Sequence, residues 1–318
     1  MSAARSSPTA TLLPSGKVLV TGGWTGALAS AEVYNPSTLS WSPAGTMSTG
    51  RGAHTATLLD SGKVLVTGGY NGGAIASAEL YDPATNAWSS AGTMAVGRHS
   101  HTATRLPSGK VLVAGGYSAI TSAQLYDPAT NSWSSAGTMA AGRYFHTATL
   151  LPSGKVLVTG GGHASAELYN PATNSWSSAG SMSAARYSHT ATLLSAGKVL
   201  ISGGSNGSYL SSVELYDPAT NSWSSARSMA GARECHTATL LSSGKVLIAG
   251  GFISTHGPLS SVELYDPATH SWSSAGTLAV GRGFHTATRL DSGQVLIAGG
   301  SPNGYNSVAL SSAELYTP

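Results

Sequence analysis

The chain has 318 residues, of which 9 % are charged and 41 % hydrophobic, and a net charge of +3. This composition is typical of a chain that folds around an apolar core, and its charges are too scattered to neutralise a nucleic-acid backbone. No apolar run approaches the ~20 residues that span a bilayer, and Met1 to Arg5 lack the apolar stretch of a signal peptide. We therefore expect no nucleic-acid partner and no membrane partner. The lone Cys235 excludes an internal disulfide framework.

Pairs of glycines divide the chain into seven units. They recur every 43 to 49 residues, a period typical of propellers and solenoids, and begin at Gly22, Gly68, Gly115, Gly160, Gly203, Gly250 and Gly299. Each unit has four short runs of β-forming residues. The runs are separated by Ser-Gly, a variable loop, Asp-Pro-Ala-Thr-Asn and Ala-Gly, all of which favour turns. This order predicts a four-stranded antiparallel meander in every unit.

Side-chain size changes from the first strand of a unit to the last. The first strand reads Thr-Ala-Thr, the second reads Val-Leu-Val, and the last two carry Tyr, Leu and Trp. Small residues fit the crowded axis of a fan, and a strand that is apolar on both faces fits a sheet packed between two others. The sequence therefore predicts an all-β, seven-bladed β-propeller that spans residues 1–318 as a single domain.

The two ends of the chain indicate where the ring is incomplete. We expect residues 1–13 to supply the innermost strand of the first blade, with Met1 at the position of the Met that follows each Trp strand. The chain ends just after the seventh template Tyr, so the last blade lacks its outer strand. The edge of Ser311 to Tyr316 is then open and invites self-association with another chain.

The order Gly-Gly, Tyr-Asp-Pro, Trp resembles the Kelch repeat, including the Kelch motifs of galactose-oxidase-like propellers, over essentially the whole chain. The resemblance implies a propeller with four strands in each blade. The chain departs from a fully closed Kelch ring because only six units have a Trp strand: Trp41, Trp88, Trp133, Trp176, Trp223 and Trp272.

Aromatic residues outside the repeated template gather at one rim of the predicted propeller. We call this rim the top face; it holds the connections between second and third strands and those between consecutive units, and the other turns form the bottom face. Exposed aromatic side chains often mark recognition surfaces, although each ring could instead pack against its neighbouring loop. The ten aromatic residues are Trp24, Tyr70, Tyr117, Tyr144, Phe145, Tyr187, Tyr209, Phe252, Phe284 and Tyr305.

An Arg-x-x-His motif enters the first strand of nearly every unit. Its arginines are Arg5, Arg51, Arg98, Arg143, Arg186, Arg233 and Arg282, and Pro8 replaces the first histidine. We expect most of these arginines to pair with a Glu that begins the third strand, because an isolated buried charge is costly. Gln124 replaces that Glu in the third unit. Arg98 and Arg143, on either side of it, are therefore the candidates for binding an acidic group of a ligand, a role that the Kelch resemblance also implies.

Three classes of function remain open, and the leading one is a non-catalytic module that binds a glycan, a peptide or a protein on the top face. The alternatives are a structural repeat scaffold, and an enzyme of the Kelch oxidase type or one with metal-assisted chemistry around Glu234, Cys235 and His236. The resemblance ties copper-radical oxidases to two Tyr, two His and a Cys joined to a Tyr ring, whereas this chain has no Tyr-His dipeptide. We therefore predict no catalytic residue, no metal ligand and no cofactor. Low Lys and abundant Ser, Thr and Gly favour an extracytoplasmic bacterial setting.

Overall fold

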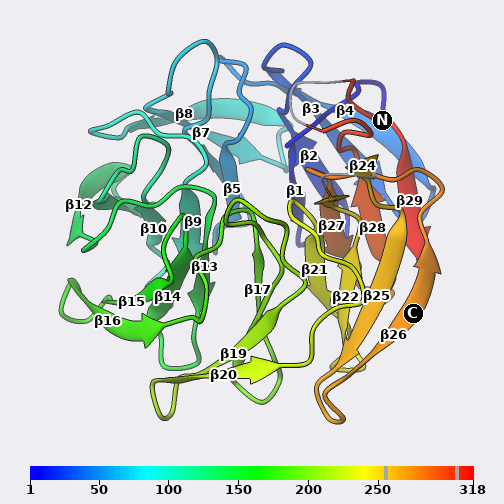
Figure 1. Cartoon of the computed structure of the whole chain (residues 1–318). Coiled ribbons are helices and arrows are strands. Elements are labelled where there is room, and N and C mark those ends of the chain that lie inside the picture. The colour runs from blue at the N-terminus through cyan, green and yellow to red at the C-terminus, as the bar shows by residue number, and fades with distance from the viewer. Residues whose placement is uncertain (254–256, 305–307) are drawn as a thin grey trace.

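A computed structural model describes residues 1–253, 257–304 and 308–318 of the chain. The described residues form strands and turns, and none of them lies in a helix that could cross a bilayer. Seven sheets surround a central axis (Figure 1), and their innermost strands contact one another in a closed circle. The predicted seven-bladed propeller is confirmed.

The strands follow the predicted meander in each blade. The innermost strands are β1 (Thr9–Leu12), β5 (Thr55–Leu58), β9 (Thr102–Arg105), β13 (His146–Leu150), β17 (Thr190–Leu193), β21 (Thr237–Leu240) and β27 (Thr286–Arg289). The second strands are β2 (Val18–Thr21), β6 (Val64–Thr67), β10 (Val111–Ala114), β14 (Val156–Gly160), β18 (Val199–Ser202), β22 (Val246–Ala249) and β28 (Val295–Ala298).

The third strands are β3 (Ser30–Asn35), β7 (Ser77–Asp82), β11 (Ser122–Asp127), β15 (Ser165–Asn170), β19 (Val213–Asp217), β25 (Ser261–Asp266) and β29 (Ala313–Tyr316). The outer strands are β4 (Ser40–Thr46), β8 (Ala87–Thr93), β12 (Ser132–Thr138), β16 (Ser175–Ser181), β20 (Ser222–Ala226) and β26 (Ser271–Thr277). A small hairpin in the sixth blade pairs β23 (Phe252–Ile253) with β24 (Gly257–Pro258). The last blade has three strands, as predicted.

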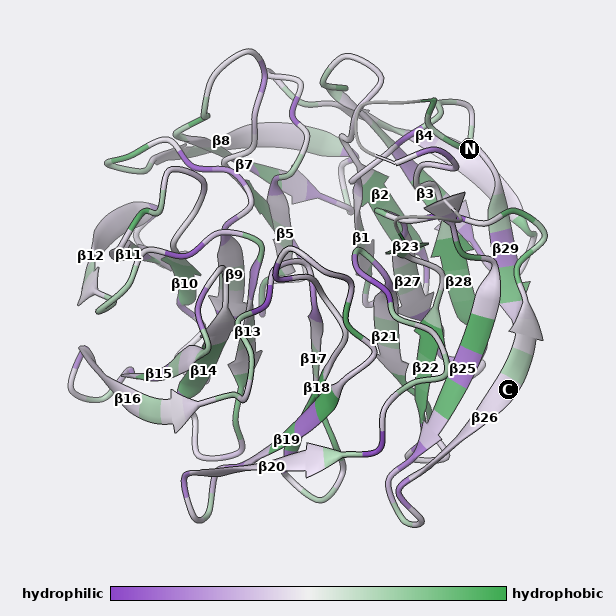
Figure 2. Ribbon diagram, viewed as in Figure 1, coloured by the Kyte–Doolittle hydropathy of each residue, from purple (hydrophilic) through white to green (hydrophobic). Residues whose placement is uncertain are grey.

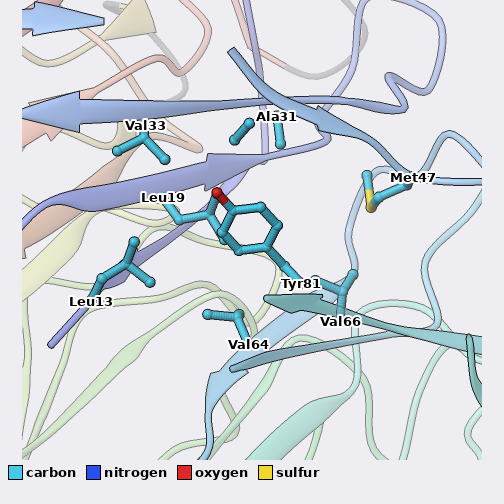
Figure 3. Packing of buried hydrophobic residues seen from close by; sticks show 9 residues of the cluster. Leu13, Leu19, Ala31, Val33, Met47, Val64, Val66 and Tyr81 are labelled. Atoms are coloured by element: carbon cyan, nitrogen blue, oxygen red, sulfur yellow. The ribbon is translucent and has the colours of Figure 1, made fainter. Parts of the chain in front are cut away.

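The hydrophobic core is divided among the seven junctions between blades. Every residue of the second strands is buried. In Figure 2, the second strands β2, β22 and β28 are green, whereas the outer strands β20 and β26 are mostly pale. In the first junction, Leu19 and Met47 of the first blade meet Val64, Val66 and Tyr81 of the second (Figure 3). Since each sheet is covered on both faces, a blade depends on both neighbours for its core.

The ring closes between the last blade and the first through side-chain packing. Leu290 and Leu296 of the last blade pack with Val18, Val20 and Tyr34 of the first. Figure 1 shows both chain ends at this junction. β1 lies in the first blade, as predicted, so no strand is shared across the junction.

The bottom turn between the third and outer strands has a left-handed residue in every complete blade. In the second blade this residue is Asn86 (φ 54°), whose Oδ1 accepts a hydrogen bond from the Tyr81 hydroxyl at 2.9 Å. Asn tolerates a left-handed backbone conformation, and its side-chain oxygen accepts the hydrogen bond of the Tyr hydroxyl. The first blade has Leu39 at this position, with φ 54° and 65 % exposure, and leucine offers Tyr34 no polar atom.

Replacing Leu39 by Asn should therefore stabilise the protein. The change relieves left-handed strain and restores a hydrogen bond to Tyr34, so we expect the free energy of unfolding to rise by about 1 to 2 kcal/mol. Urea denaturation followed by circular dichroism measures it. The reverse change in the second blade, Asn86→Leu, is the matched control and should cost a similar amount; a less stable Leu39→Asn protein would contradict this account of the turn.

Candidate functional site

The top face is built from two backbone segments in each blade. In five blades the residue after the template Arg forms an isolated β-bridge with the residue after the Gly-Gly turn, as Ser6 does with Trp24, Gly52 with Tyr70 and Glu234 with Phe252. These bridges hold the top loops against the entrance to the innermost strand. An aromatic side chain on either segment is therefore placed by the scaffold.

A belt of backbone hydrogen bonds surrounds the mouth of the central channel. Its members precede the template His or Pro8, and all have φ between 49° and 54°: Ser7, Ala53, Ser100, Phe145, Ser188, Cys235 and Phe284. Six amides of the belt donate to the carbonyl of the preceding member at 2.9 to 3.0 Å, with Ser7 donating to Phe284 across the junction between the last and first blades. The left-handed conformation thus aligns one amide and one carbonyl per blade around the axis.

Aromatic rings form a continuous arc over the first five blades. Consecutive ring centroids are 4.9 to 5.8 Å apart, within the range of favourable ring contacts, in the order Trp24, Tyr70, His99, Tyr117, Tyr144, Tyr187. His99 lies in this arc, stacked on Tyr117 with an interplanar angle of 20°, although the sequence did not single it out as a ring of the site. The clue in the sequence is its position, the same as that of Tyr144 and Tyr187.

Four rings of the arc, those of Trp24, Tyr70, His99 and Tyr117, line a half-open cavity of about 430 Å³ next to the channel mouth. None of its lining residues carries a formal charge near neutral pH, because burial lowers the pKa of His99 below its usual value. The lining consists of Ser6, Ser7, Trp24, Ala53, Tyr70, His99, Ser100, Tyr117, Phe145 and Phe284. We call this space the aromatic cavity.

Three glycines fix the orientation of rings on the top face. A Cβ at Gly52 would lie 2.3 Å from the Trp24 indole, one at Gly283 would lie 2.1 Å from the Phe252 ring, and one at Gly162 would lie 2.2 Å from the Tyr187 hydroxyl. Each ring therefore packs closely against a glycine. The sequence left open whether each ring packs against its neighbouring loop or helps to form a recognition surface. The structure shows rings that pack against a glycine and also lie together on the top face.

The structure distributes the predicted aromatic residues among different environments. Tyr117 is 52 % exposed, whereas Phe252 is buried beneath Phe284, with ring centroids 5.5 Å apart, so Phe252 is not accessible on this surface. Tyr209 lies outside the aromatic cavity; burial and then the nearby Glu234 and Cys235 raise its pKa. Hydrogen bonding with Tyr187 raises the pKa of Tyr144. Tyr305 lies outside the described residues.

The template arginines clamp the top loops to the sheets. All seven are at most 1 % exposed, and each Nη1 donates to a carbonyl of the Gly-Gly turn at 2.6 to 2.8 Å and to the Ser carbonyl before the third strand or at its start. The expected carboxylate pairing is confirmed in six blades, with N–O distances of 2.6 to 3.1 Å: Arg5–Glu32, Arg51–Glu79, Arg143–Glu167, Arg186–Glu214, Arg233–Glu263 and Arg282–Glu314.

Arg98 lacks a carboxylate partner, as the sequence predicts, but it is not accessible. Its side chain is fully buried, and burial lowers its pKa to about 10. Gln124 has one acceptor oxygen, which takes the amide of Ala95 at 3.0 Å, and its NH₂ group cannot accept from a guanidinium. Arg143 is equally buried and paired. The expectation that Arg98 and Arg143 face a ligand is therefore wrong in this structure, because both serve the clamp.

Restoring the missing carboxylate should stabilise the third blade. In Gln124→Glu, one oxygen can still accept the Ala95 amide while the other faces Arg98, so we expect about 1.5 to 3 kcal/mol of added stability, the usual contribution of a hydrogen bond to a charged group. Thermal unfolding at pH 7 measures it. The converse variant, Glu79→Gln, should lose stability. An unchanged or lower melting temperature for Gln124→Glu would show that Arg98 gains nothing from a carboxylate.

The template histidines join neighbouring blades. Nε2 of His54 lies 3.0 Å from the hydroxyls of both Thr9 and Thr21 in the preceding blade, and the other five histidines contact the corresponding Thr or Ser residues. Burial, followed by the charge of Arg51, lowers the pKa of His54 to about 3. Repetition of the motif in the sequence indicates a structural role for these histidines. The Thr and Ser hydroxyls that they contact can be identified only in the structure.

These buried imidazoles should make stability depend on pH. They are neutral in the folded state, with pKa values lowered to about 3 for His54, His146, His189 and His285, whereas the unfolded chain binds protons near pH 6.5. The contribution of these histidines to the free energy of unfolding is complete above pH 6.5. It is lost as the pH falls towards 3, at up to about 1.4 kcal/mol per pH unit for each histidine.

Urea denaturation at several values between pH 7 and pH 5, above the carboxylate range, measures this slope. His54→Gln keeps a donor for Thr9 but does not titrate, and should show a slope smaller by about one proton. An unchanged slope would mean that His54 is already protonated in the folded state.

The contacts of Glu234, Cys235 and His236 bear on whether the top face has an enzymatic site. Glu234 is 5 % exposed and accepts a hydrogen bond from the Ser205 hydroxyl at 2.5 Å, and His236 Nε2 lies 3.1 Å from Thr190 Oγ1. Cys235 belongs to the left-handed belt. Within the described ranges, no group of three or more His, Cys, Asp or Glu side chains is arranged to hold a metal ion.

Comparison with known proteins agrees with this architecture. A model of the KLHDC2/KLHL20/DRC7 Kelch-repeats domain matches residues 53–251 and 145–316, and a Kelch-motif model matches residues 5–48. The chain therefore belongs to the Kelch-repeat family. A search of curated proteins found no match.

Among solved structures, the chain is similar to a "novel fungal alcohol oxidase with catalytic diversity among the AA5 family, in complex with copper". The TM-score is 0.81 at 20 % identity, over 95 % of this chain and 72 % of that one. At this identity the likeness shows the fold alone.

Proposed function

We propose that this protein is a non-catalytic binding module that takes an uncharged part of a glycan or peptide ligand into the aromatic cavity. The supporting observation is the cavity itself, whose 430 Å³ falls in the range of small-ligand pockets and whose wall combines aromatic faces with serine hydroxyls. Flat rings beside hydroxyls suit ligands with both apolar and polar faces. Membership of the Kelch family, whose propellers commonly bind protein partners, supports the peptide form of the ligand.

The distribution of charge argues against an acidic ligand in this cavity. No Lys or Arg lines the space. The neighbouring template arginines Arg5, Arg51 and Arg98 are buried beneath the top loops, where backbone carbonyls accept from the Nη1 of each and a glutamate also pairs with Arg5 and with Arg51. A carboxylate or sulfate would lose its hydration without gaining a counter-charge, which is costly. The binding of an acidic group by free arginines, weighed from the sequence, is therefore less well supported than binding of a neutral group.

A second candidate is oxidation chemistry near Cys235, favoured by the fold shared with the copper-containing alcohol oxidase. Within this chain, Tyr209 is close enough to Glu234 and Cys235 for both to raise its pKa. An assay of alcohol and sugar oxidation after addition of Cu²⁺ separates the candidates. Turnover that disappears in Glu234→Ala or Cys235→Ala would replace the binding proposal with an enzymatic one.

Removing rings from the aromatic cavity should weaken binding without unfolding the protein. Tyr117 is half-exposed and Phe145 lines the cavity, so Tyr117→Ala and Phe145→Ala should each lower the affinity for a ligand by about 1 to 2 kcal/mol, as expected for aromatic anchors. Glycan and peptide arrays identify the ligand, and isothermal titration calorimetry measures its affinity.

The control lies on the bottom face, where Leu39→Asn changes an exposed apolar residue and preserves the fold. Its affinity should equal that of the unmodified protein. A ligand whose affinity depends on Leu39 and is indifferent to Tyr117 and Phe145 would place the binding surface on the bottom face and refute the proposal.

A further inference from the structure

On the bottom face, the Lys that precedes the second strand normally pairs with the Asp that ends the third. Four blades contain this ion pair, with N–O distances of 3.1 to 3.2 Å: Lys63–Asp82, Lys110–Asp127, Lys198–Asp217 and Lys245–Asp266. In the first blade Asn35 replaces the Asp, and no ion pair joins Lys17 to a carboxylate of the described residues. Asp291 lies beside Gly16 of the same turn without pairing with Lys17. Lys17 is therefore an exposed ammonium group without a counter-charge.

Lys17 lies in the wall of a cavity of about 540 Å³ that opens between the first and second blades. The hydroxyl-bearing residues Ser15, Ser42 and Ser61 line the same space. Much of the remaining wall is apolar or aromatic and includes Leu13, Pro14, Val33, Pro43, Tyr81 and Pro83. A single cation thus stands at the edge of an apolar space, and no carboxylate lines that space. We call it the bottom cavity.

Two further departures from the template lie in the wall of the bottom cavity. Val33 occupies the position of Leu in the other blades, and it is one methylene smaller: Leu80, Leu125, Leu168, Leu215, Leu264 and Leu315. Pro43 occupies the position of a Ser in the other complete blades and adds an apolar surface. The first blade therefore combines a freed cation, a smaller side chain and a more apolar wall at one place.

We propose that the bottom cavity binds a small carboxylic acid with an apolar body. The ligand carboxylate pairs with Lys17 and accepts hydrogen bonds from Ser15 and Ser42, while its apolar part packs against Val33 and Pro43. One ammonium group matches a monoanion, and the cavity volume falls in the range of small-ligand pockets. The aromatic cavity, which lacks a cation, lies on the opposite face, so the two sites are independent.

Octanoate is the probe that tests this proposal. Its binding to the full chain is measured by isothermal titration calorimetry at low salt, where charge pairing is least screened. We expect saturable binding with a Kd at or below about 1 mM, and binding of octanamide, which keeps the apolar body but lacks the charge, weaker by at least about fivefold. No saturation by about 10 mM octanoate, or equal binding of octanamide, overturns the proposal.

The variant Asn35→Asp gives Lys17 the counter-charge that the other lysines have. It should preserve the turn, because Asp82 Oδ1 accepts the Ala84 amide at 2.9 Å just as Asn35 Oδ1 accepts the Ser37 amide at 3.0 Å. We expect octanoate binding to weaken at least about fivefold, since the internal carboxylate competes for the ammonium group and repels the ligand, with no fall in melting temperature. Unchanged octanoate binding in this folded variant would contradict the role of Lys17.

The variant Val33→Leu tests the space rather than the charge, and should weaken octanoate and octanamide alike. Lys155→Met is the matched control, because Lys155 also faces an Asn, Asn170, in the fourth blade but lies outside the bottom cavity. Lys155→Met and the aromatic-cavity variant Tyr117→Ala should both bind octanoate like the unmodified protein. If Tyr117→Ala or Lys155→Met loses octanoate binding, or if Val33→Leu keeps it in full, the site is not the bottom cavity and the proposal is wrong.

Discussion

The burial of seven guanidinium groups beneath the top face is the constraint on which the rest of the molecule depends. A buried cation needs hydrogen-bond acceptors, and the Nη1 of each arginine donates to two of them, a carbonyl of the Gly-Gly turn and the carbonyl of the serine near the start of the third strand. The turn, the third strand and the entrance to the first strand are thereby held in one geometry. The arginines therefore fix the position of the top loops.

Because the template residues provide this support, the positions between them can vary without loss of the fold. The residue after each Arg is Ser, Gly, His, Tyr or Glu in different blades, yet the backbone around it repeats. As a result, the top face differs from blade to blade. Aromatic rings lie over the first five blades, and the buried Glu234 lies next to Cys235 in the sixth. A regular scaffold thus carries an asymmetric surface.

The sequence predicted what repetition reveals, namely the blade number, the strand order, the missing outer strand and the Arg–Glu pairing. The sequence did not predict which side chains are accessible where that depends on how neighbouring loops lie in space. Arg98 was expected to be accessible because its carboxylate is missing, but burial of an arginine here is imposed by backbone carbonyls and does not require the acid. The burial of Phe252 depends on Gly283 in the next repeat, and the role of His99 depends on Tyr70 and Tyr117 on either side.

Within the part of the chain that the structure describes, the junction between the first and last blades is joined by noncovalent contacts. It is held by the side chains around Val18 and Leu296, by the belt contact of Ser7 and by the hydrogen bonds of Met1 and Arg5. Trp24 and Ser6 lie in the first blade. Phe284 lies in the last blade, so the aromatic cavity spans the junction, and a ligand that contacts both Trp24 and Phe284 would link the first blade to the last.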